Sequence, residues 1–262
     1  MLTGQEMFRS KSSYTVQSVE KALDILELLA DELSDATLPH IAEKLGISRN
    51  KAFRLLATLE SRGLVQREEH SGIYRVGLDT VGLAQRFIRG ANLIKHAHPV
   101  MEELARKHEE AVYLTVLLGE EVLFLDVVDG AQTVKTAPLV GKKFPCLTNA
   151  PGKVIKALES SDLLEKVFKK GRRRMAQDDM AKLETELGEI RRKRVAVGHD
   201  CLGEGIIDVA VAIKDYAGKV VGAITLMGPA FRLFAERIEN EIVPSLLEGA
   251  DMLSLKFGYA KF

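Results

Sequence analysis

The stretch from Ala42 to Glu68 constrains the fold most, because it combines a turn with a strongly amphipathic helix. Ser48 is placed to cap this helix, and Gly63 is expected to stop it just after Ser61. The spacing i, i+3, i+4, i+7 puts one set of apolar side chains on a single helix face, which must point inward. This apolar stripe consists of Ala52, Leu55, Leu56 and Leu59.

Two shorter elements are expected before this helix, and a hairpin after it. Ser18 is placed to cap a first helix, and Pro39 suits the first turn of a short second helix that Gly46 ends. Residues 64–77 predict two short strands around the polar, glycine-containing loop 69–72. The apolar residues of the first helix recur at helical spacing at Val19, Ala22, Leu23, Leu26, Leu29 and Ala30. The order helix, helix, turn, helix, hairpin is the outline of a winged helix-turn-helix.

The face opposite the apolar stripe is basic, although the chain as a whole is neutral, with 37 Lys+Arg and 37 Asp+Glu. From Lys44 to Arg67 there are six basic side chains and a single acid, Glu60. Such a patch indicates a polyanionic partner, and the major groove of double-stranded DNA admits an α-helix. The outward side chains expected to contact DNA are Arg49, Asn50, Lys51, Phe53 and Arg54. A basic helix face alone is usually only solvated, but that alternative leaves the turn and the hairpin unexplained.

The hairpin carries a second set of candidate DNA contacts. Arg67, His70 and Arg75 lie on or beside it and are expected to touch phosphates. Phosphate contacts would position the domain on DNA without reading the base sequence.

Residues 78–110 are again helical, and Gly90 and Pro99 are expected to break or bend the run. The apolar faces of this segment are too wide for a simple spacer. A two-fold dimer is the economical partner, because paired DNA readers need a set separation. Packing on the same chain is the alternative. The apolar residues concerned are Leu83, Phe87, Leu93, Ile94, Val100, Met101 and Leu104.

From residue 111 the pattern changes to strands. Residues 111–128 predict two strands joined at Gly119-Glu120, and residues 206–228 predict two more joined at Tyr216-Ala217-Gly218. Further expected elements are a strand at 133–138 and helices at 149–159, 162–169, 178–194 and 235–257. This order predicts an α/β domain with a mostly antiparallel sheet, and the chain as a whole is of the α+β class.

Cysteine content and hydropathy indicate the compartment. Cys146 and Cys201 are the only cysteines, too few for a disulfide scaffold and typical of a reducing cytoplasm. Residues 1–13 lack the apolar core of a signal peptide, and no apolar run approaches the roughly 20 residues of a membrane helix. We therefore expect a soluble cytoplasmic protein with no membrane partner.

His199-Asp200-Cys201, together with Cys146, offers the nitrogen, oxygen and sulfur ligands that Zn²⁺ takes. Their spacing is not a usual zinc pattern, so these residues are weak metal candidates and no cofactor is expected. They would also permit a Cys–His nucleophile, but no third orienting group is indicated. An enzyme with an accessory DNA-binding domain and a protein–protein interaction module are the alternatives to a DNA-binding regulator.

Five segments, in this order and spacing, resemble the IclR family of bacterial transcription regulators. They are "VQSVEKALDILELLA", "LPHIAEKLGISRNKAFRLLATLESRGLVQRE", "GIYRVG", "VGKKFPCLTNAPGKVIKALES" and "EGIIDVAVAIKDYAGKVVGAITLMGP". The resemblance spans nearly the whole chain, from about Tyr14 to Leu255. Asn50-Lys51 replaces the Ser-Thr that the family often has in its recognition helix, so base preference does not carry over.

The resemblance implies a domain organisation and partners. The implied domains are a winged helix-turn-helix at 14–77, a helical linker or dimerisation segment at 78–110 and a GAF-like effector-binding domain at 111–262. A homodimer or homotetramer would bind palindromic operator DNA. A small metabolite, often a carboxylate or an aromatic acid in this family, would regulate that binding.

The strongest local signal for a ligand is the run from Thr148 to Lys153. Thr148 or Asn149 is placed to cap a helix that starts here, and the free N–H groups of a helix start bind anions. Gly152 would let a ligand approach the backbone closely. Ordinary helix capping is the alternative interpretation.

The resemblance places a ligand pocket between this helix start, the sheet and the loop ending at Glu204-Gly205. The expected effector contacts are Thr148, Asn149, Ala150, Gly152, Asp208, Thr225 and Met227. Leu114 and Val116 are expected to contribute from the first strand. Asp208 stands where the family often has Cys, and Met227 where it often has Ser or Thr. Asp208 would repel a bound carboxylate, so it pairs with a cation, is protonated, or faces a hydroxylated or amine-bearing ligand.

Overall fold

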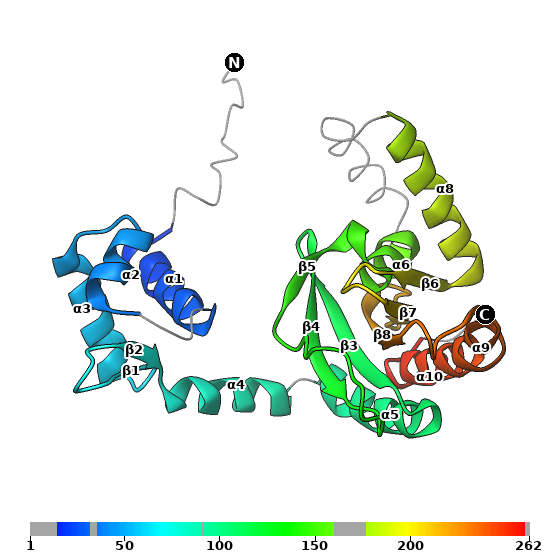
Figure 1. Ribbon diagram of the computed structural model, residues 1–262, viewed down its shortest axis with the longest axis horizontal. Helices are drawn as coiled ribbons and strands as arrows, with labels where there is room; N and C mark the ends of the chain where they lie inside the picture. Colours follow the sequence, from blue (N-terminus) through cyan, green and yellow to red (C-terminus); the bar gives the residue numbers. More distant parts are fainter. Residues whose placement is uncertain (1–14, 32–35, 91, 160–176, 260–262) are drawn as a thin grey trace, which may run out of the picture. The chain divides into compact units, whose positions relative to one another are not determined.

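The chain divides into two compact units, Met1–Gly90 and Ala91–Phe262 (Figure 1). The first is built from helices and a small hairpin, and the second from a sheet with helices. Within the described residues, none of the helices has the length and apolar composition that a membrane crossing requires. The computed structural model describes residues 15–31, 36–90, 92–159 and 177–259.

The first unit has the order of elements that the sequence predicts (Figure 1). Its elements are α1 (Gln17–Asp31), α2 (Leu38–Lys44), α3 (Arg49–Ser61), β1 (Val65–Arg67), β2 (Tyr74–Val76) and α4 (Leu78–Gly90). Strands β1 and β2 form an antiparallel hairpin, and a bridge between Thr37 and Ile73 ties the segment before α2 to it. The expected winged helix-turn-helix is therefore confirmed.

Local signals set most of these boundaries. The Ser48 hydroxyl accepts the Lys51 N–H at 3.2 Å and caps α3. Gly46 and Gly63 follow α2 and α3 with φ of 62° and 66°, a left-handed conformation that glycine adopts without strain. The expected cap at Ser18 is wrong, because α1 already begins one residue earlier.

The apolar stripe of α3 packs into the core of the first unit. Ala52, Leu56 and Leu59 are buried and Leu55 is partly buried, as predicted. Because this stripe points inward, the opposite side of α3 is left to solvent. The buried partners of the stripe come from α1, α2 and the hairpin: Ile25, Leu29, Ile41, Val65 and Tyr74.

The second unit is built on a six-stranded sheet with the order β5-β4-β3-β8-β7-β6, in which all neighbouring strands are antiparallel. The expected α+β class and mostly antiparallel sheet are confirmed. The strands are β3 (Ala111–Leu118), β4 (Glu121–Val128), β5 (Lys143–Pro145), β6 (Val195–His199), β7 (Ile206–Lys214) and β8 (Val220–Pro229). The helices are α5 (Asn92–His108), α6 (Ala150–Leu158), α8 (Gln177–Lys193), α9 (Ala235–Arg237), a π-helical turn (Ile238–Ile242) and α10 (Val243–Lys256).

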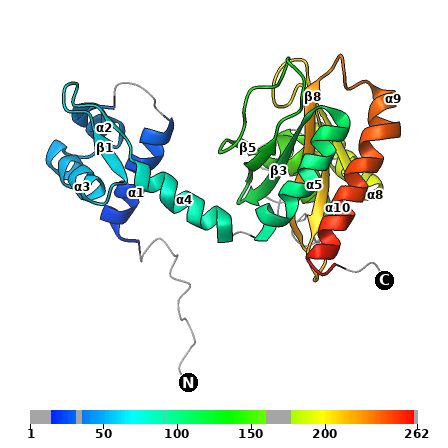
Figure 2. The same ribbon diagram turned by 90° about the horizontal axis from the view of Figure 1, so that it is seen from below.

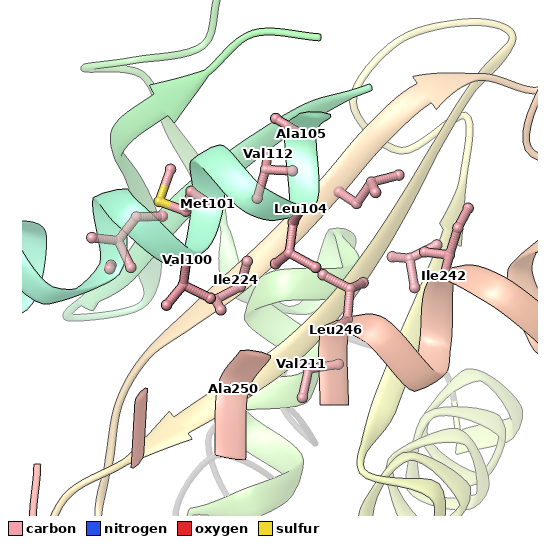
Figure 3. Packing of buried hydrophobic residues seen from close by; sticks show 14 of the residues in the cluster. Val100, Met101, Leu104, Ala105, Val112, Val211, Ile224, Ile242, Leu246 and Ala250 are labelled. Carbon is pink, nitrogen blue, oxygen red and sulfur yellow. The ribbon is translucent and has the colours of Figure 1, made fainter. Parts of the chain in front are cut away.

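Helices cover both faces of this sheet. Helices α5 and α10 lie side by side on one face (Figure 2), and α6 with α8 packs on the other. In the core of the first face, Val100 and Leu104 of α5 meet Leu246 of α10 over Ile224 of β8 (Figure 3). Side chains along β3, β7 and β8 alternate between these two apolar layers.

Several elements differ from the sequence-based expectations. Residues 133–138 form no strand, and the short strands β5 and β6 were not predicted, because three to five residues carry too little periodicity. Pro99 lies inside α5 without ending it. The expected helix at 162–169 lies outside the described residues.

The apolar residues of 92–108 pack on their own chain rather than being left for a partner. Ile94, Val100, Met101 and Leu104 are buried in the core between α5, the sheet and α10. The apolar surface that could face a second copy is therefore confined, in this segment, to α4.

Leu246→Ala should lower the free energy of unfolding by about 2–5 kcal/mol, because it leaves a cavity in a core where Leu246 is fully buried. Leu255→Ala on the same helix is the matched control, since Leu255 is 64% exposed, and it should change stability by less than about 0.5 kcal/mol. Urea unfolding followed by circular dichroism measures both. Equal losses would contradict the assignment of the α10 faces.

Candidate functional site

The outward face of α3 is accessible and polar. Arg49, Asn50 and Arg54 are exposed, Phe53 is 51% exposed, and Lys51 is half-buried. Arg49 and Asn50 lie in the first turn of α3, the part of a recognition helix that reaches base edges. Among the described residues, no ion pair engages the guanidinium groups of Arg49 or Arg54. Both are therefore available to an anionic partner.

A hollow of about 560 Å³ lies between the start of α1 and α3. Arg54 and Lys51 line it together with the hydroxyl-bearing residues Ser18, Ser48 and Thr58. The cationic and hydroxyl side chains around this hollow can donate hydrogen bonds to phosphate oxygens. Ser18 thus lies in this candidate DNA surface, although it does not cap α1.

The basic residues of the hairpin have different neighbours. The Arg67 guanidinium lies over the Tyr74 ring, 5.7 Å from its centroid. Arg75 lies 3.8 Å from the Glu68 carboxylate, which also accepts a 2.5 Å hydrogen bond from the Ser71 hydroxyl. His70 is exposed in the turn of the hairpin. Arg75 therefore has a carboxylate beside it, and Arg67 and His70 are the better placed phosphate ligands.

The start of α6 is closed by the chain's own side chains. Asn149 caps the helix, as expected, and its Oδ1 accepts the Gly152 N–H at 2.9 Å. The Ala150 N–H donates to Asp208 Oδ2 at 2.8 Å, and Pro151 has no N–H to offer. The expectation of free N–H groups at this helix start is therefore wrong, because intramolecular acceptors take them.

Thr148 and Gly152 have structural roles at this point. Thr148 is exposed, and its hydroxyl donates to the Pro145 carbonyl at 2.8 Å instead of capping α6. The Asn149 side-chain amide donates to the same carbonyl at 2.9 Å. A Cβ on Gly152 would collide with the backbone carbonyl of Cys146, so this glycine is required for the close packing of α6 on that turn.

Asp208 is a fully buried carboxyl on β7, with 0% exposure. Its Oδ2 accepts the Ala150 N–H, and its Oδ1 has no hydrogen-bond partner among the described residues. Burial raises the pKa of Asp208, while the Ala150 N–H and the Lys153 ammonium oppose that rise. Gly198, paired with Asp208 on β6, leaves room for the carboxyl, because a Cβ there would meet its oxygens.

Thr225 and Met227 lie on the same face of the sheet as Asp208. Met227 pairs with Asp208, and Thr225 pairs with Ala210, two residues along β7. The Thr225 hydroxyl is also buried without a hydrogen-bond partner in the described part of the chain. Leu114 lies on the opposite face, in the core under α5 and α10, because side chains alternate along β3. Leu114 therefore does not share a face of the sheet with Asp208, Thr225 and Met227, contrary to expectation.

An aromatic cluster that the sequence interpretation missed lies beside these residues. Tyr113 of β3 pairs with Thr225, and its ring meets Phe124 edge to face at 5.4 Å. Phe124 in turn meets Phe144 at 5.6 Å. Burial raises the pKa of the Tyr113 phenol. The sequence of β3 contained this signal, because side chains alternate along a strand. If Leu114 points toward α5 and α10, its neighbour Tyr113 must point to the other face of the sheet.

Two family models match the chain. One describes the IclR helix-turn-helix domain and matches residues 18–69, and the other describes the C-terminal part of the bacterial transcriptional regulator IclR and matches residues 85–255. The chain belongs to the IclR family. Like other members, it is a DNA-binding transcriptional regulator with a C-terminal effector domain, as the sequence resemblance predicts.

Individual IclR-family proteins match over almost the full length. The HTH-type transcriptional regulator KdgR of Escherichia coli (strain K12) is 25% identical, with 95% of each chain covered. The crystal structure of an IclR regulator from Alicyclobacillus acidocaldarius has a TM-score of 0.82 and 27% identity, covering 92% of this chain and 99% of that one. An IclR homologue from Microbacterium hydrocarbonoxydans, complexed with 4-hydroxybenzoate, shares the fold with a TM-score of 0.77 and 21% identity, covering 92% and 98%.

The IclR family consists of regulators rather than enzymes, which removes the need for a catalytic role of the cysteines. The Cys201 thiol donates to the His199 carbonyl, and Asp200 accepts the Gly205 N–H, so both residues shape the β6–β7 loop. Burial raises the pKa values of both Cys146 and Cys201, which disfavours the reactive thiolate. Within the described ranges, no cluster of three His, Cys, Asp or Glu side chains is placed to hold a metal.

A second hollow, of about 760 Å³, runs along the edge strand β6. Val195, Val197 and Ile207 line it, with Leu233 and Ile238 from the opposite wall. Sequence reasoning missed it because β6 itself was not predicted.

Asp208→Asn should change the pH dependence of stability. The raised pKa means that the folded chain keeps this proton at pH values where the unfolded chain has lost it. The contribution of Asp208 to the free energy of unfolding therefore falls as pH rises from the ordinary Asp pKa of 3.8 toward the folded-state pKa, by at most about 1.4 kcal/mol per pH unit.

The variant lacks this titration, so the stability difference between variant and wild type should shift in favour of the variant over that pH window. Urea unfolding of both proteins between about pH 4 and 8 measures the difference. A difference that stays constant with pH would contradict the burial of an ionisable Asp208.

Proposed function

We propose that this IclR-family regulator binds double-stranded operator DNA as a dimer through α3 and the hairpin, and that a small molecule bound in the second unit sets its operator affinity. The observation that carries the proposal is the division of α3 into two faces. The buried stripe fixes the helix in the first unit, and the exposed face presents cationic and amide side chains. That arrangement matches a recognition helix.

The DNA contacts fall into two classes. Arg49, Asn50, Lys51, Phe53 and Arg54 face outward from α3 and are assigned to the major groove, where arginine and asparagine pair with base edges. Arg67 and His70 on the hairpin are assigned to phosphates, which set the orientation of the domain. A regulator that binds chromosomal operators works in the cytoplasm of a bacterium.

Dimerisation is proposed through the first unit. Val19 and Leu23 on α1 are 56% and 54% exposed, and Leu78 and Val81 on α4 are 82% and 54% exposed. Exposed apolar side chains on each of these helices favour burial against a second copy. A two-fold dimer would present two copies of α3 to the halves of a palindromic operator. A tetramer would then be a pair of such dimers.

The effector site is assigned to the face of the sheet that carries Asp208, Thr225 and Met227, next to the α6 start formed by Thr148, Asn149, Ala150 and Gly152. Two buried polar atoms without partners on this face support the assignment, because such atoms are rare unless a further group binds them. The 4-hydroxybenzoate complex of the Microbacterium homologue supports a small organic effector. The ligand would act by favouring one of two arrangements with different operator affinity.

Arg54→Ala should weaken operator binding about 5- to 150-fold and relax base preference at one position, because a bidentate arginine–base contact contributes about 1–3 kcal/mol. The operator is first selected from a random duplex library with the purified wild-type protein, and affinities are measured by fluorescence anisotropy. Arg192→Ala, in the exposed face of α8, is the matched control and should bind like wild type.

Unchanged affinity and base preference in Arg54→Ala would contradict the assignment of α3 as the recognition helix. The salt dependence distinguishes DNA recognition from a protein–protein module, because each phosphate contact adds about −0.9 to the slope of log K against log salt.

Leu23→Asp should convert the dimer to a monomer, because a carboxylate cannot be buried in an apolar interface without a partner. Light scattering coupled to size-exclusion chromatography measures the mass. Leu118→Asp is the control at nearly equal exposure, 53% against 54%, and should leave the mass unchanged. A dimeric Leu23→Asp protein would rule out the α1 surface as the interface.

A further inference from the structure

The start of α6 already carries a carboxyl group, and that group belongs to the chain. The first turn of a helix leaves N–H groups that attract carboxylates and phosphates. Here the Ala150 N–H donates to Asp208 at 2.8 Å, and the Gly152 N–H donates to the Asn149 side chain at 2.9 Å. The Lys153 N–H donates to the Asn149 carbonyl at 3.0 Å. The chain itself therefore takes the N–H groups of Ala150, Gly152 and Lys153.

The Asp208 carboxylate is held there by tertiary structure. It comes from β7, 58 residues along the chain from Ala150, and it is fully buried. A Cβ at Gly198 on the neighbouring strand would collide with Asp208 Oδ1, so the absence of a side chain at 198 makes room for the carboxyl. The nearby Lys153 ammonium is paired with Glu186 at 2.7 Å and not with Asp208.

Within the described ranges, two buried polar atoms remain without a hydrogen-bond partner on this face. Asp208 Oδ1 and Thr225 Oγ1 are both buried, and neither has a hydrogen-bond partner among the described residues. Thr225 pairs with Ala210, two residues from Asp208, so the two side chains are diagonal neighbours on one face of adjacent strands. Unpaired buried polar atoms are costly, and a group with several donors would satisfy both.

The charge at this point selects between ligand classes. A second carboxylate would stand next to a buried carboxyl that already holds the Ala150 N–H, and like charges repel strongly away from water. A protonated amine has three donors and the opposite charge, so its chemistry suits both a carboxylate at Asp208 and the hydroxyl of Thr225. Tyr113 and Met227, on the same face, offer an apolar surface to the rest of such a ligand.

Resting on the proposed function, which places the effector on this face, we propose that Asp208 is the specificity-determining residue of the site. It occupies the α6 start in place of a ligand carboxylate and selects an effector that carries a primary amino group. Both polar groups are buried, so binding would require the side chains over them to move.

The test uses pairs of probes that differ only in the charged group. 4-Hydroxybenzylamine is compared with 4-hydroxybenzoate, benzylamine with benzoate, and hexylamine with hexanoate, each in a thermal unfolding assay on the intact chain. At least one amine should raise Tm by about 5 °C at a hundredfold excess over its Kd. The carboxylic acid paired with that amine, its acid twin, should leave Tm unchanged.

Asp208→Asn provides the second arm. Loss of a charged hydrogen-bond acceptor should weaken amine binding about 10- to 100-fold, and the acid twin should gain affinity because the repelling charge is gone. Asp24→Asn, in the first unit, is the matched control and should keep the wild-type preference. If Asp208→Asn does not fold, the wild-type preference between the twins decides the question alone.

Three outcomes would overturn the proposal: acid twins that stabilise the wild type as well as the amines do, no shift with any probe, or full amine binding by Asp208→Asn. Operator binding is measured separately by anisotropy on the same samples. If the wild type binds no operator, the proposed function itself is contradicted. If it binds operator but shows no preference for amines, only the proposed role of Asp208 is contradicted.

Discussion

The inner strands β7 and β8 are covered by helices on both faces, and the second unit depends on this double burial. Almost every side chain along the two strands is buried, whichever way it points. One layer, under α5 and α10, holds the largest cluster of buried apolar side chains. The other layer, under α6, is interrupted by Asp208 and Thr225. A carboxyl in such a layer costs stability, so its presence there points to a role in binding rather than in folding.

The two units have different roles in regulation. In the first, apolar packing of α3 on α1 and α2 fixes one helix face and thereby defines which side chains can reach DNA. In the second, the hydrogen bond between the Ala150 N–H and Asp208 joins a helix start to the middle of the sheet. Under the proposed function, a ligand bound to Asp208 Oδ1 would act on both elements at once, because Oδ2 of the same carboxyl holds the Ala150 N–H.

The DNA-binding half could be predicted from sequence because its signals are local. The spacing of Ala52, Leu56 and Leu59, the Ser48 cap and the glycines after each helix fix the structure within about 30 residues of chain. The effector half could be predicted only in outline. Short strands such as β5 and β6 carry no periodicity of their own. The acceptor of the Ala150 N–H lies 58 residues away in sequence, so a helix start that looked open is closed by tertiary structure.

The close approach of Gly198 to the Asp208 carboxyl ties two positions on adjacent strands to each other. While aspartate occupies 208, a side chain at 198 would collide with its carboxyl; once 208 becomes smaller, that collision disappears. The substitutions that one position tolerates therefore depend on the residue at the other. This is epistasis between two positions that are paired on adjacent strands. Conversion of this protein into a biosensor for organic acids would begin with that pair, not with the DNA reader.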